Sequence, residues 1–473
     1  MRADALIRFR LAKHARATHK IRSMPRRLLA LLTLGVTAAG LIAGCASKPA
    51  PARDLKTASA PAQAPSLNLT LAEPLPPALP PVMLGIDVLE ADRFAAIAGK
   101  RIGLLTHPAG VNRRGESTVD VIRRAPGAKL VALFGPEHGI YGDARAGDNI
   151  ADTVDRRTGL PVYSLHGKFR KPTKEMLKGI DALVIDLQDI GSRSYTFVSC
   201  MRWTMEACFT HGVEVIILDR PNPLGGLKVD GPPLDPEWTS YVGAFRVPYV
   251  HGLTIGELAR MAKEAPGVLA VNEKIRTKGK LTVIPMRGWS RAMRWPDTGL
   301  RWVPPSPAVP EFNAAAGYAM VGLGTEIGGW TWGIGTFYPF RGIGYPKKTP
   351  DQIIAELNQY KIPGIRLDKT SGIGRDGKVI GGVYVEITDW EAWRPTMLSF
   401  YMMKTAAKWS TINPFTIAPG DRQNMFNKLT GSTAWWKALT RDGARVDVAS
   451  FLKNWDERAQ VYQQQSRKYW LYR

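Results

Sequence analysis

Glu137 and His138 occupy an unusual position in the sequence, directly after a run of apolar residues. The run KLVALF (129–134) is typical of a buried strand, and Gly135 and Pro136 end it. A carboxyl group shielded by a proline and by apolar strand residues can have a raised pKa, which suits it to donate a proton. We therefore expect Glu137 to act as a general acid at the mouth of a core strand.

Polar or titratable side chains also follow the other apolar runs in this part of the chain. They are His107 after 101–106, His166 after 160–165, Gln188, Asp189, Arg193 and Tyr195 after 181–187, and Arg220 and Asn222 after 213–218. The carboxyl ends of parallel strands meet at one edge of a sheet, where open α/β sheets bind their ligands. Helix capping or turn formation explains any one of these residues equally well, but it does not explain the whole set.

The sequence lacks the motifs of several common chemistries. It has no Gly-rich dinucleotide turn after the first apolar run, no P-loop, no GxSxG elbow and no HExxH. The histidines near expected loops, His251 among them, do not have the spacing of a metal site. We therefore expect neither a cofactor nor a metal.

Carboxylates in the expected crevice point to hydrolysis of a glycosidic bond, which needs two carboxyl groups. Asp189 is the best candidate for the second group, either as a catalytic carboxylate or as a residue that positions the substrate. Asp186 falls inside an apolar run, which is more typical of a structural residue. Glu257 lies three residues after Thr254, which predicts a capped helix start.

The elements that must position these residues alternate along the chain. The apolar runs are separated by helical stretches at 117–124, 173–179 and 197–211, which predicts an α/β fold. We expect a Rossmann-like, doubly wound parallel sheet domain over residues 84–275. A smaller C-terminal α/β domain is expected over 276–473, with strands at 281–287 and 381–389 and helices at 351–360, 395–409 and 450–465. Residues 288–346 show no clear periodicity.

The first 45 residues are typical of a bacterial lipoprotein signal peptide. A basic stretch precedes an apolar segment, 28–42, which is too short for a comfortable membrane span. Small residues lead to Cys45, which we expect to carry the lipid. Residues 46–83, rich in proline and alanine, are expected to form a linker. Because Ala46 follows the cysteine, we expect an outer-membrane lipoprotein of the bacterial cell envelope that faces the periplasm.

The net charge of +23 and the cysteine content restrict the partners and the fold. The charge favours anionic surroundings, but the basic residues are scattered rather than clustered with aromatic residues, so we expect no nucleic acid partner. Cys200 and Cys208 lie eight residues apart on an expected helix, too far for a disulfide. We expect two buried thiols.

Several segments together resemble the NamZ-type exo-β-N-acetylmuramidase family. They are GIDVL, LFGPEHGIYGD, TGLPVYSLHGKFRKPT, DLQDIGSRSYTF, LDRPNPLGG, HGLTIGELAR, DTGLRWVPPSP and the C-terminal YWLYR, in that order from about residue 84 to 473. The resemblance implies a Rossmann-like domain and a smaller C-terminal domain, with the active site in the cleft between them. It also implies that Glu137, in the PEHG motif, is the catalytic glutamate.

The substrate implied by this resemblance is a peptidoglycan fragment with a non-reducing terminal N-acetylmuramic acid. Its lactyl carboxylate needs a cation, for which Arg193 and Arg220 are the first candidates and His138 and His251 lesser ones. Tyr195, Trp295 and Trp302 either cover a sugar face or pack in the core. Gln188 and Asn222 complete the expected substrate-binding residues, and muropeptides or disaccharides are the expected partners.

The sequence departs from the family pattern in its second half. Leu323, Glu326 and Ile334 stand where relatives carry an acid, an amide and an arginine, and Ala308 replaces an asparagine. These differences leave two hypotheses. The chain is either an active glycosidase with altered specificity or a non-catalytic peptidoglycan-binding lipoprotein on the same scaffold.

Overall fold

The computed structural model describes residues 81–333, 337–373 and 377–473. The expected signal peptide, Cys45 and nearly all of the expected linker lie outside the described residues, as does Ile334. No described helix is long and apolar enough to cross a membrane.

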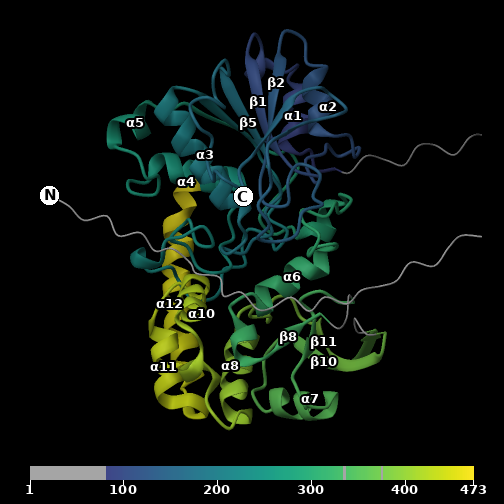
Figure 1. The fold of residues 1–473 in the computed structure, drawn as a ribbon, viewed down its shortest axis with the longest axis vertical. Helices are drawn as coiled ribbons and strands as arrows, with labels where there is room; N and C mark the ends of the chain where they lie inside the picture. Colours follow the sequence, from purple (N-terminus) through teal and green to yellow (C-terminus); the bar gives the residue numbers. More distant parts are fainter. Residues whose placement is uncertain (1–80, 334–336, 374–376) are drawn as a thin grey trace, which may run out of the picture. The chain divides into compact units, whose positions relative to one another are not determined.

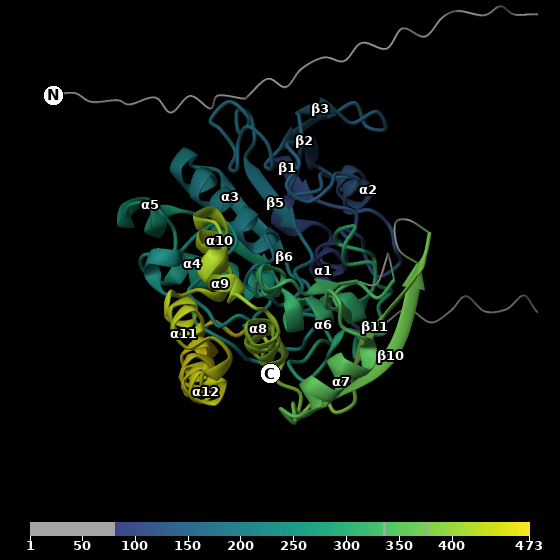
Figure 2. The same ribbon diagram turned by 60° about the horizontal axis from the view of Figure 1, so that its bottom comes forward.

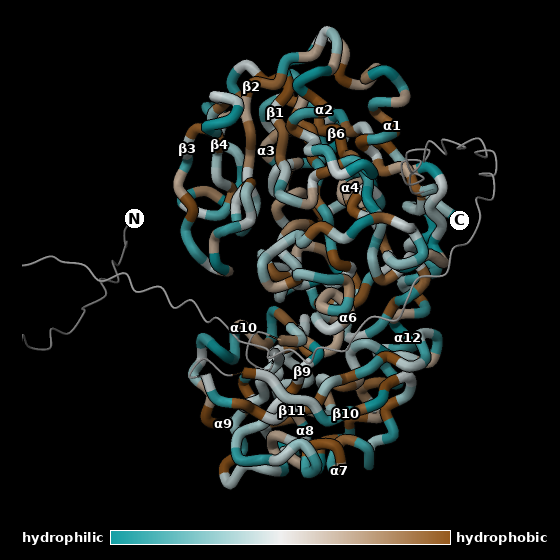
Figure 3. The backbone as a smooth tube through the Cα atoms, turned by 90° about the vertical axis from the view of Figure 1, so that its right-hand side faces the viewer, coloured by the Kyte–Doolittle hydropathy of each residue, from teal (hydrophilic) through white to brown (hydrophobic). Residues whose placement is uncertain are grey.

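A seven-stranded sheet forms the first part of the fold, in the order β3-β4-β2-β1-β5-β6-β7. Its strands are β1 (Arg101–Thr106), β2 (Lys129–Gly135), β3 (Thr153–Val154), β4 (Pro161–Ser164), β5 (Ala182–Asp186), β6 (Glu214–Leu218) and β7 (Leu281–Ile284). All neighbours pair in parallel except β3, which runs antiparallel to β4. Parallel strands are buried on both faces, which explains their continuous apolar sequences and their largely hydrophobic colouring in Figure 3.

Helices cover both faces of this sheet (Figures 1 and 2). Leu104 of β1 packs with α1 (Gly85–Ala91) and α2 (Thr118–Arg123), whereas Leu105 packs with α3 (Phe197–His211) and α4 (Ile255–Glu264). Adjacent residues of a strand therefore belong to two different hydrophobic cores, because successive side chains point to opposite faces of the sheet. The expected α/β fold class is confirmed.

The first sheet extends beyond residue 275, where the sequence placed the domain boundary. β7 pairs with β6, and α5 (Glu273–Lys278) connects α4 to it. The C-terminus also packs on this part, because the Tyr472 hydroxyl donates to Asp219 at 2.6 Å. The pairing of β7 with β6 and the packing of the C-terminal segment are long-range contacts. Local sequence patterns cannot predict such contacts.

A smaller four-stranded sheet and a group of helices form the C-terminal part (Figure 1). The sheet has the order β10-β11-β9-β8, with β8 (Thr331–Trp332), β9 (Gly342–Gly344), β10 (Ile365–Ile373) and β11 (Val379–Ile387). The helices are α6 (Phe312–Val321), α7 (Pro350–Asn358), α8 (Met397–Trp409), α9 (Pro414–Ile417), α10 (Gly420–Thr430), α11 (Ala434–Asp442) and α12 (Val448–Ser466). They enclose a separate core that contains Trp330, Trp393 and Trp435.

Two local expectations differ from the structure and two agree with it. Residues 173–179 form turns rather than a helix, and the apparently irregular stretch 288–346 contains α6. The expected capped helix start is present. The Thr254 hydroxyl accepts from the Glu257 amide, and the Glu257 carboxylate accepts from the Thr254 amide. Both cysteines of α3 are buried free thiols, as expected.

Candidate active site

Glu137 lies in the loop that follows β2 and is held there by two hydrogen bonds. The Thr196 hydroxyl donates to Glu137 Oε2 at 2.6 Å, and the Gly147 amide donates to Oε1 at 2.9 Å. Thr196 stands immediately before α3, so this carboxylate joins the loop after β2 to the start of a helix. The Glu137 side chain is 13% exposed, so a substrate can reach it while most of the carboxylate is shielded.

The loop around Glu137 is tightly folded. His138 has a φ of 72°, a left-handed conformation that histidine adopts more readily than most residues. Its Nδ1 donates to the Ala144 carbonyl at 2.8 Å, which fixes the ring. The hydrogen bond from His138 to Ala144 thus stabilises the loop in which the Gly147 amide donates to Glu137.

His166 and Arg170 complete the surroundings of Glu137. His166 Nε2 lies 3.6 Å from Glu137 Oε1, and the Arg170 guanidinium contacts the His166 ring. The same guanidinium lies 4.8 Å above the ring of Tyr241. Burial lowers the pKa of His166, and the charge of Arg170 adds to this effect against the opposing charge of Glu137.

The pKa of Glu137 is lowered rather than raised, which corrects the expectation of a ready general acid. Burial alone would raise it, but the Thr196 hydrogen bond, the charge on His166, the Gly147 amide and His138 together outweigh burial. Hydrogen bonds to the charged form of a carboxyl stabilise that form. Glu137 is ionised in the free protein and is suited to attack a substrate or to activate water.

The Asp189 side chain is almost completely buried. It is 3% exposed, accepts from the Gly191 amide at 2.8 Å, and faces His251 Nε2 at 3.3 Å. His251 Nδ1 accepts from the Leu253 amide at 3.2 Å, which places the ring proton on Nε2, toward Asp189. These contacts identify Asp189 and His251 as a pair that holds the loop after β5.

The hydroxyl of Tyr318 lies among three carboxylates. Burial and the charges of Glu137, Glu326 and Asp189 together raise the pKa of Tyr318 to about 12, against the hydrogen bond with Ser194. Glu326 itself has a raised pKa because of burial, although its residue remains exposed. Sequence patterns did not indicate Tyr318 or Thr196, since neither belongs to the polar residues that directly follow an apolar run.

The guanidinium groups of Arg193 and Arg220 are already engaged, which corrects their expected role as readers of a substrate carboxylate. Arg193 is 1% exposed and donates to the carbonyls of Pro232, Val247 and Leu429. Arg220 forms a bidentate ion pair with Asp186, with a contact of 2.9 Å from Nη2. Both arginines therefore stabilise the fold. The sequence could not indicate these partners, because they lie far away along the chain.

The remaining expected binding residues are also buried in the protein. Gln188 donates to the carbonyls of Asp189 and Pro221, and Asn222 donates to that of Leu253. Tyr195 packs against Phe197 and Tyr318. The indoles of Trp295 and Trp302 lie edge to face with centroids 4.9 Å apart, so both pack in the core rather than cover a sugar.

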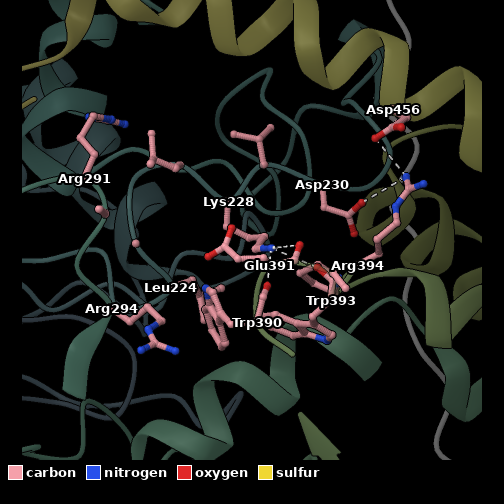
Figure 4. Close-up of a pocket in the computed structure, with 16 residues that line it drawn as sticks. Leu224, Lys228, Asp230, Arg291, Arg294, Trp390, Glu391, Trp393, Arg394 and Asp456 are labelled. Carbon is pink, nitrogen blue, oxygen red and sulfur yellow. Dashed lines mark hydrogen bonds and ion pairs between the residues drawn. The ribbon is translucent and has the colours of Figure 1, made fainter. Parts of the chain in front are cut away.

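A cavity of about 350 Å³ lies elsewhere, between loops of the two parts of the fold (Figure 4). Lys228 donates to the carbonyls of Trp390 and Trp393 across it, and Arg394 lies between Asp230 and Asp456 at 3.7 and 3.1 Å. Neither Glu137 nor any residue bonded to Glu137 lines this cavity. Among its charged groups, Arg394 is paired with Asp230 and Asp456, whereas the Lys228 ammonium is bound by backbone carbonyls.

The described residues include no group of three or more His, Cys, Asp or Glu side chains that could hold a metal ion.

Comparisons with known proteins cover both parts of the fold. The family models for the N-terminal and C-terminal domains of the exo-beta-N-acetylmuramidase NamZ match residues 102–313 and 316–472. The peptidoglycan beta-N-acetylmuramidase NamZ of Bacillus subtilis (strain 168) is 37% identical over 399 residues, which are 83% of this chain and 92% of that protein.

Two solved structures from Bacteroides fragilis NCTC 9343, both described as DUF1343 family proteins, are also similar. The first has a TM-score of 0.75 and 36% identity, and covers 84% of this chain and 100% of its own. The second has a TM-score of 0.63 and 27% identity, and covers 83% of this chain and 99% of its own.

Proposed function

The chain belongs to the NamZ family of exo-beta-N-acetylmuramidases and is a glycoside hydrolase, and we propose that it removes non-reducing terminal N-acetylmuramic acid from peptidoglycan fragments. The observation that carries this proposal is the state of Glu137. It is a shielded, ionised carboxylate at the mouth of β2, held by Thr196 and Gly147 and partly open to solvent.

Glycoside hydrolysis needs one carboxylate that attacks or activates water and a second group that protonates the leaving oxygen. We assign the first role to Glu137, because its pKa is lowered. Glu326 is the better candidate for the second role than Asp189, because its residue is exposed, whereas Asp189 is 3% exposed.

The alternative of a non-catalytic binding protein rested on the departures at Leu323, Glu326 and Ile334. Glu326 is a titratable group placed near Tyr318, whose pKa also responds to Glu137. A carboxyl group at this position supports the hypothesis of an active site with altered specificity better than the hypothesis of a protein that has lost its activity.

The assay that tests this proposal uses a chain that begins at residue 46 and so lacks the lipidated Cys45, with a chromogenic N-acetylmuramic acid glycoside and its N-acetylglucosamine analogue. We expect release from the first substrate and at least a hundredfold loss of kcat in Glu137→Gln, because the ionised carboxylate is removed while its size is kept. Wild-type turnover by Glu137→Gln, with an unchanged melting temperature, would refute the assignment.

Arg170 is the cation that we assign to the lactyl carboxylate, in place of Arg193 and Arg220. It contacts the His166 ring beside Glu137 and forms no ion pair with a described carboxylate. A bidentate guanidinium suits a carboxylate better than a point charge does. Arg170→Met should raise KM for the muramic acid glycoside about tenfold and leave kcat nearly unchanged, and Arg170→Lys should recover part of the loss. Equal KM values in Arg170→Met and wild type would exclude this role.

The cellular location is a further part of the proposal and is supported by the sequence of the N-terminus. We propose that Cys45 carries a lipid and that the proline-rich residues after it tether the enzyme to the outer membrane, facing the periplasm. At about 3.1 Å per residue, an extended linker of this kind would reach roughly 110 Å. An enzyme so placed would meet wall fragments during cell-wall recycling.

A further inference from the structure

A second cavity, of about 430 Å³, lies at the carboxyl edge of the first sheet, apart from Glu137. Its walls come from the segment after β1, from Gln188 after β5, from Arg220 after β6, and from residues 295–303. Glu137 follows β2 and bonds Thr196 at the start of α3, on the face of the sheet that α3 covers. The second cavity instead borders Leu84 and Trp295, which belong to the core on the opposite face.

The cavity lies where the winding of the sheet reverses. From β1 the chain proceeds to β2 and β4 in one direction, and from β5 to β6 and β7 in the other. Open α/β sheets bind ligands outside the carboxyl ends of the strands at such a point. The volume is also within the range of small-ligand sites.

The charged residues that line the cavity are all basic. The described residues that line the cavity include four arginines, Arg113, Arg114, Arg220 and Arg301, but no aspartate or glutamate. Three of these arginines pair with carboxylates that do not line the cavity: Arg113 with Asp87, Arg114 with Glu90, and Arg220 with Asp186. Arg301 is exposed and makes no ion pair or hydrogen bond with the described part of the chain. Its guanidinium is available to an anion.

Two buried polar atoms of the lining residues also lack a partner. Gln188 is 1% exposed and Trp295 is 6% exposed, yet Gln188 Oε1 and Trp295 Nε1 make no hydrogen bond to the described residues. Both atoms are covered by protein, so neither is open to the cavity, and the charged groups that the cavity offers to a ligand are its arginines.

We propose that this cavity is a second binding site for a small organic oxyanion, a carboxylate or a phosphate ester, with Arg301 as the principal cation. The site does not depend on the hydrolytic activity proposed for Glu137.

The test measures binding of two anionic probes, N-acetylmuramic acid and inorganic phosphate, to the purified protein by calorimetry, with N-acetylglucosamine as the neutral probe. Arg301→Ala should weaken binding of an anionic probe at least tenfold, and Arg301→Glu should abolish it. Arg246→Ala, which removes an exposed arginine with no described partner, is the matched control and should bind as wild type does.

The two probes distinguish the source of the anion. Arg301-dependent binding of N-acetylmuramic acid supports a carboxylate ligand from the wall, and Arg301-dependent binding of phosphate alone supports a phosphorylated ligand. Binding of N-acetylmuramic acid that is lost in Arg170→Met but unchanged in Arg301→Glu, together with no Arg301-dependent phosphate binding, would overturn the proposal. Hydrolysis is measured separately, so failure of the activity proposed for Glu137 leaves this result interpretable.

Discussion

At the scale of single residues, the chemistry depends on the protonation state of Glu137. A carboxylate in a partly buried site is stabilised in its charged form only if donors compensate for the lost water. Thr196 and Gly147 supply those donors, one to each oxygen. The sequence correctly directed attention to Glu137, but it could not indicate Thr196, which lies 59 residues away in the chain.

Thr196→Val should move the acidic limb of the pH–rate profile to higher pH. The Thr196 hydroxyl stabilises the ionised form of Glu137, so its removal raises the pKa of Glu137 and more of the enzyme is protonated at low pH. We expect kcat/KM on the acidic limb to fall roughly tenfold, the loss of one charge-assisted hydrogen bond.

Thr196→Ser is the matched control, because it keeps the hydroxyl and removes only a methyl group. Its acidic limb should coincide with that of the wild type. A uniform loss of activity in Thr196→Val at every pH, without a shift of the limb, would indicate that Thr196 acts only by packing.

At the scale of elements, local patterns predicted what local physics determines. The apolar runs of β1, β2 and β5 are continuous because parallel strands are covered on both faces, and the stretch predicted as a helix at 197–211 is α3. Pairing between distant loops is different. Arg193 appeared available for a ligand because the carbonyls that it binds, up to Leu429, cannot be identified from neighbouring residues.

Lys228 illustrates how one side chain joins two such loops (Figure 4). Its Nζ donates to the carbonyls of Trp390, Glu391 and Trp393, at 2.6, 3.2 and 3.1 Å. Lys228→Met keeps the length of the side chain but leaves these carbonyls without their donor. We expect the free energy of unfolding to fall by about 2 kcal/mol, measured by urea denaturation.

Lys453→Met serves as the comparison for Lys228→Met. Lys453 is exposed on α12 and has no hydrogen bond or ion pair within the described ranges, so its replacement should change the stability by less than about 0.5 kcal/mol. An equally small effect in Lys228→Met would show that water replaces the lysine at no cost.

At the scale of the whole molecule, the end of the chain is bound at the β6–β7 side of the first sheet. Leu471 donates its amide to Glu257 at 2.9 Å, and Arg291 donates to the same carboxylate at 2.6 Å while its guanidinium lies 3.7 Å from the Trp470 ring. The segment YWLYR was identified in the sequence only through a family resemblance. Its structural role is to donate hydrogen bonds to two buried carboxyl groups, Asp219 after β6 and Glu257 on α4.

Asp219 makes the stability of this assembly depend on pH. It is completely buried at the end of β6, and burial raises its pKa from 3.8 to about 6, although the hydroxyls of Tyr472 and Thr254 and the Gly256 amide oppose the shift. A carboxyl whose folded-state pKa exceeds its unfolded-state pKa favours folding when it is protonated. Its stabilising contribution is therefore fully present below pH 3.8 and is lost as the pH rises through about 6.

The measurement is the free energy of unfolding of the wild type and of Asp219→Asn by urea denaturation between pH 4 and 7. The wild type should lose roughly 2 kcal/mol more than Asp219→Asn over this interval, since one pKa unit corresponds to about 1.4 kcal/mol and part of the contribution is already lost at pH 4. The comparison uses the difference in slope, because the amide cannot accept from all four donors of Asp219 and will lower the stability at every pH. Parallel curves for the two proteins would mean that Asp219 stays ionised in the folded state, with its donors outweighing burial.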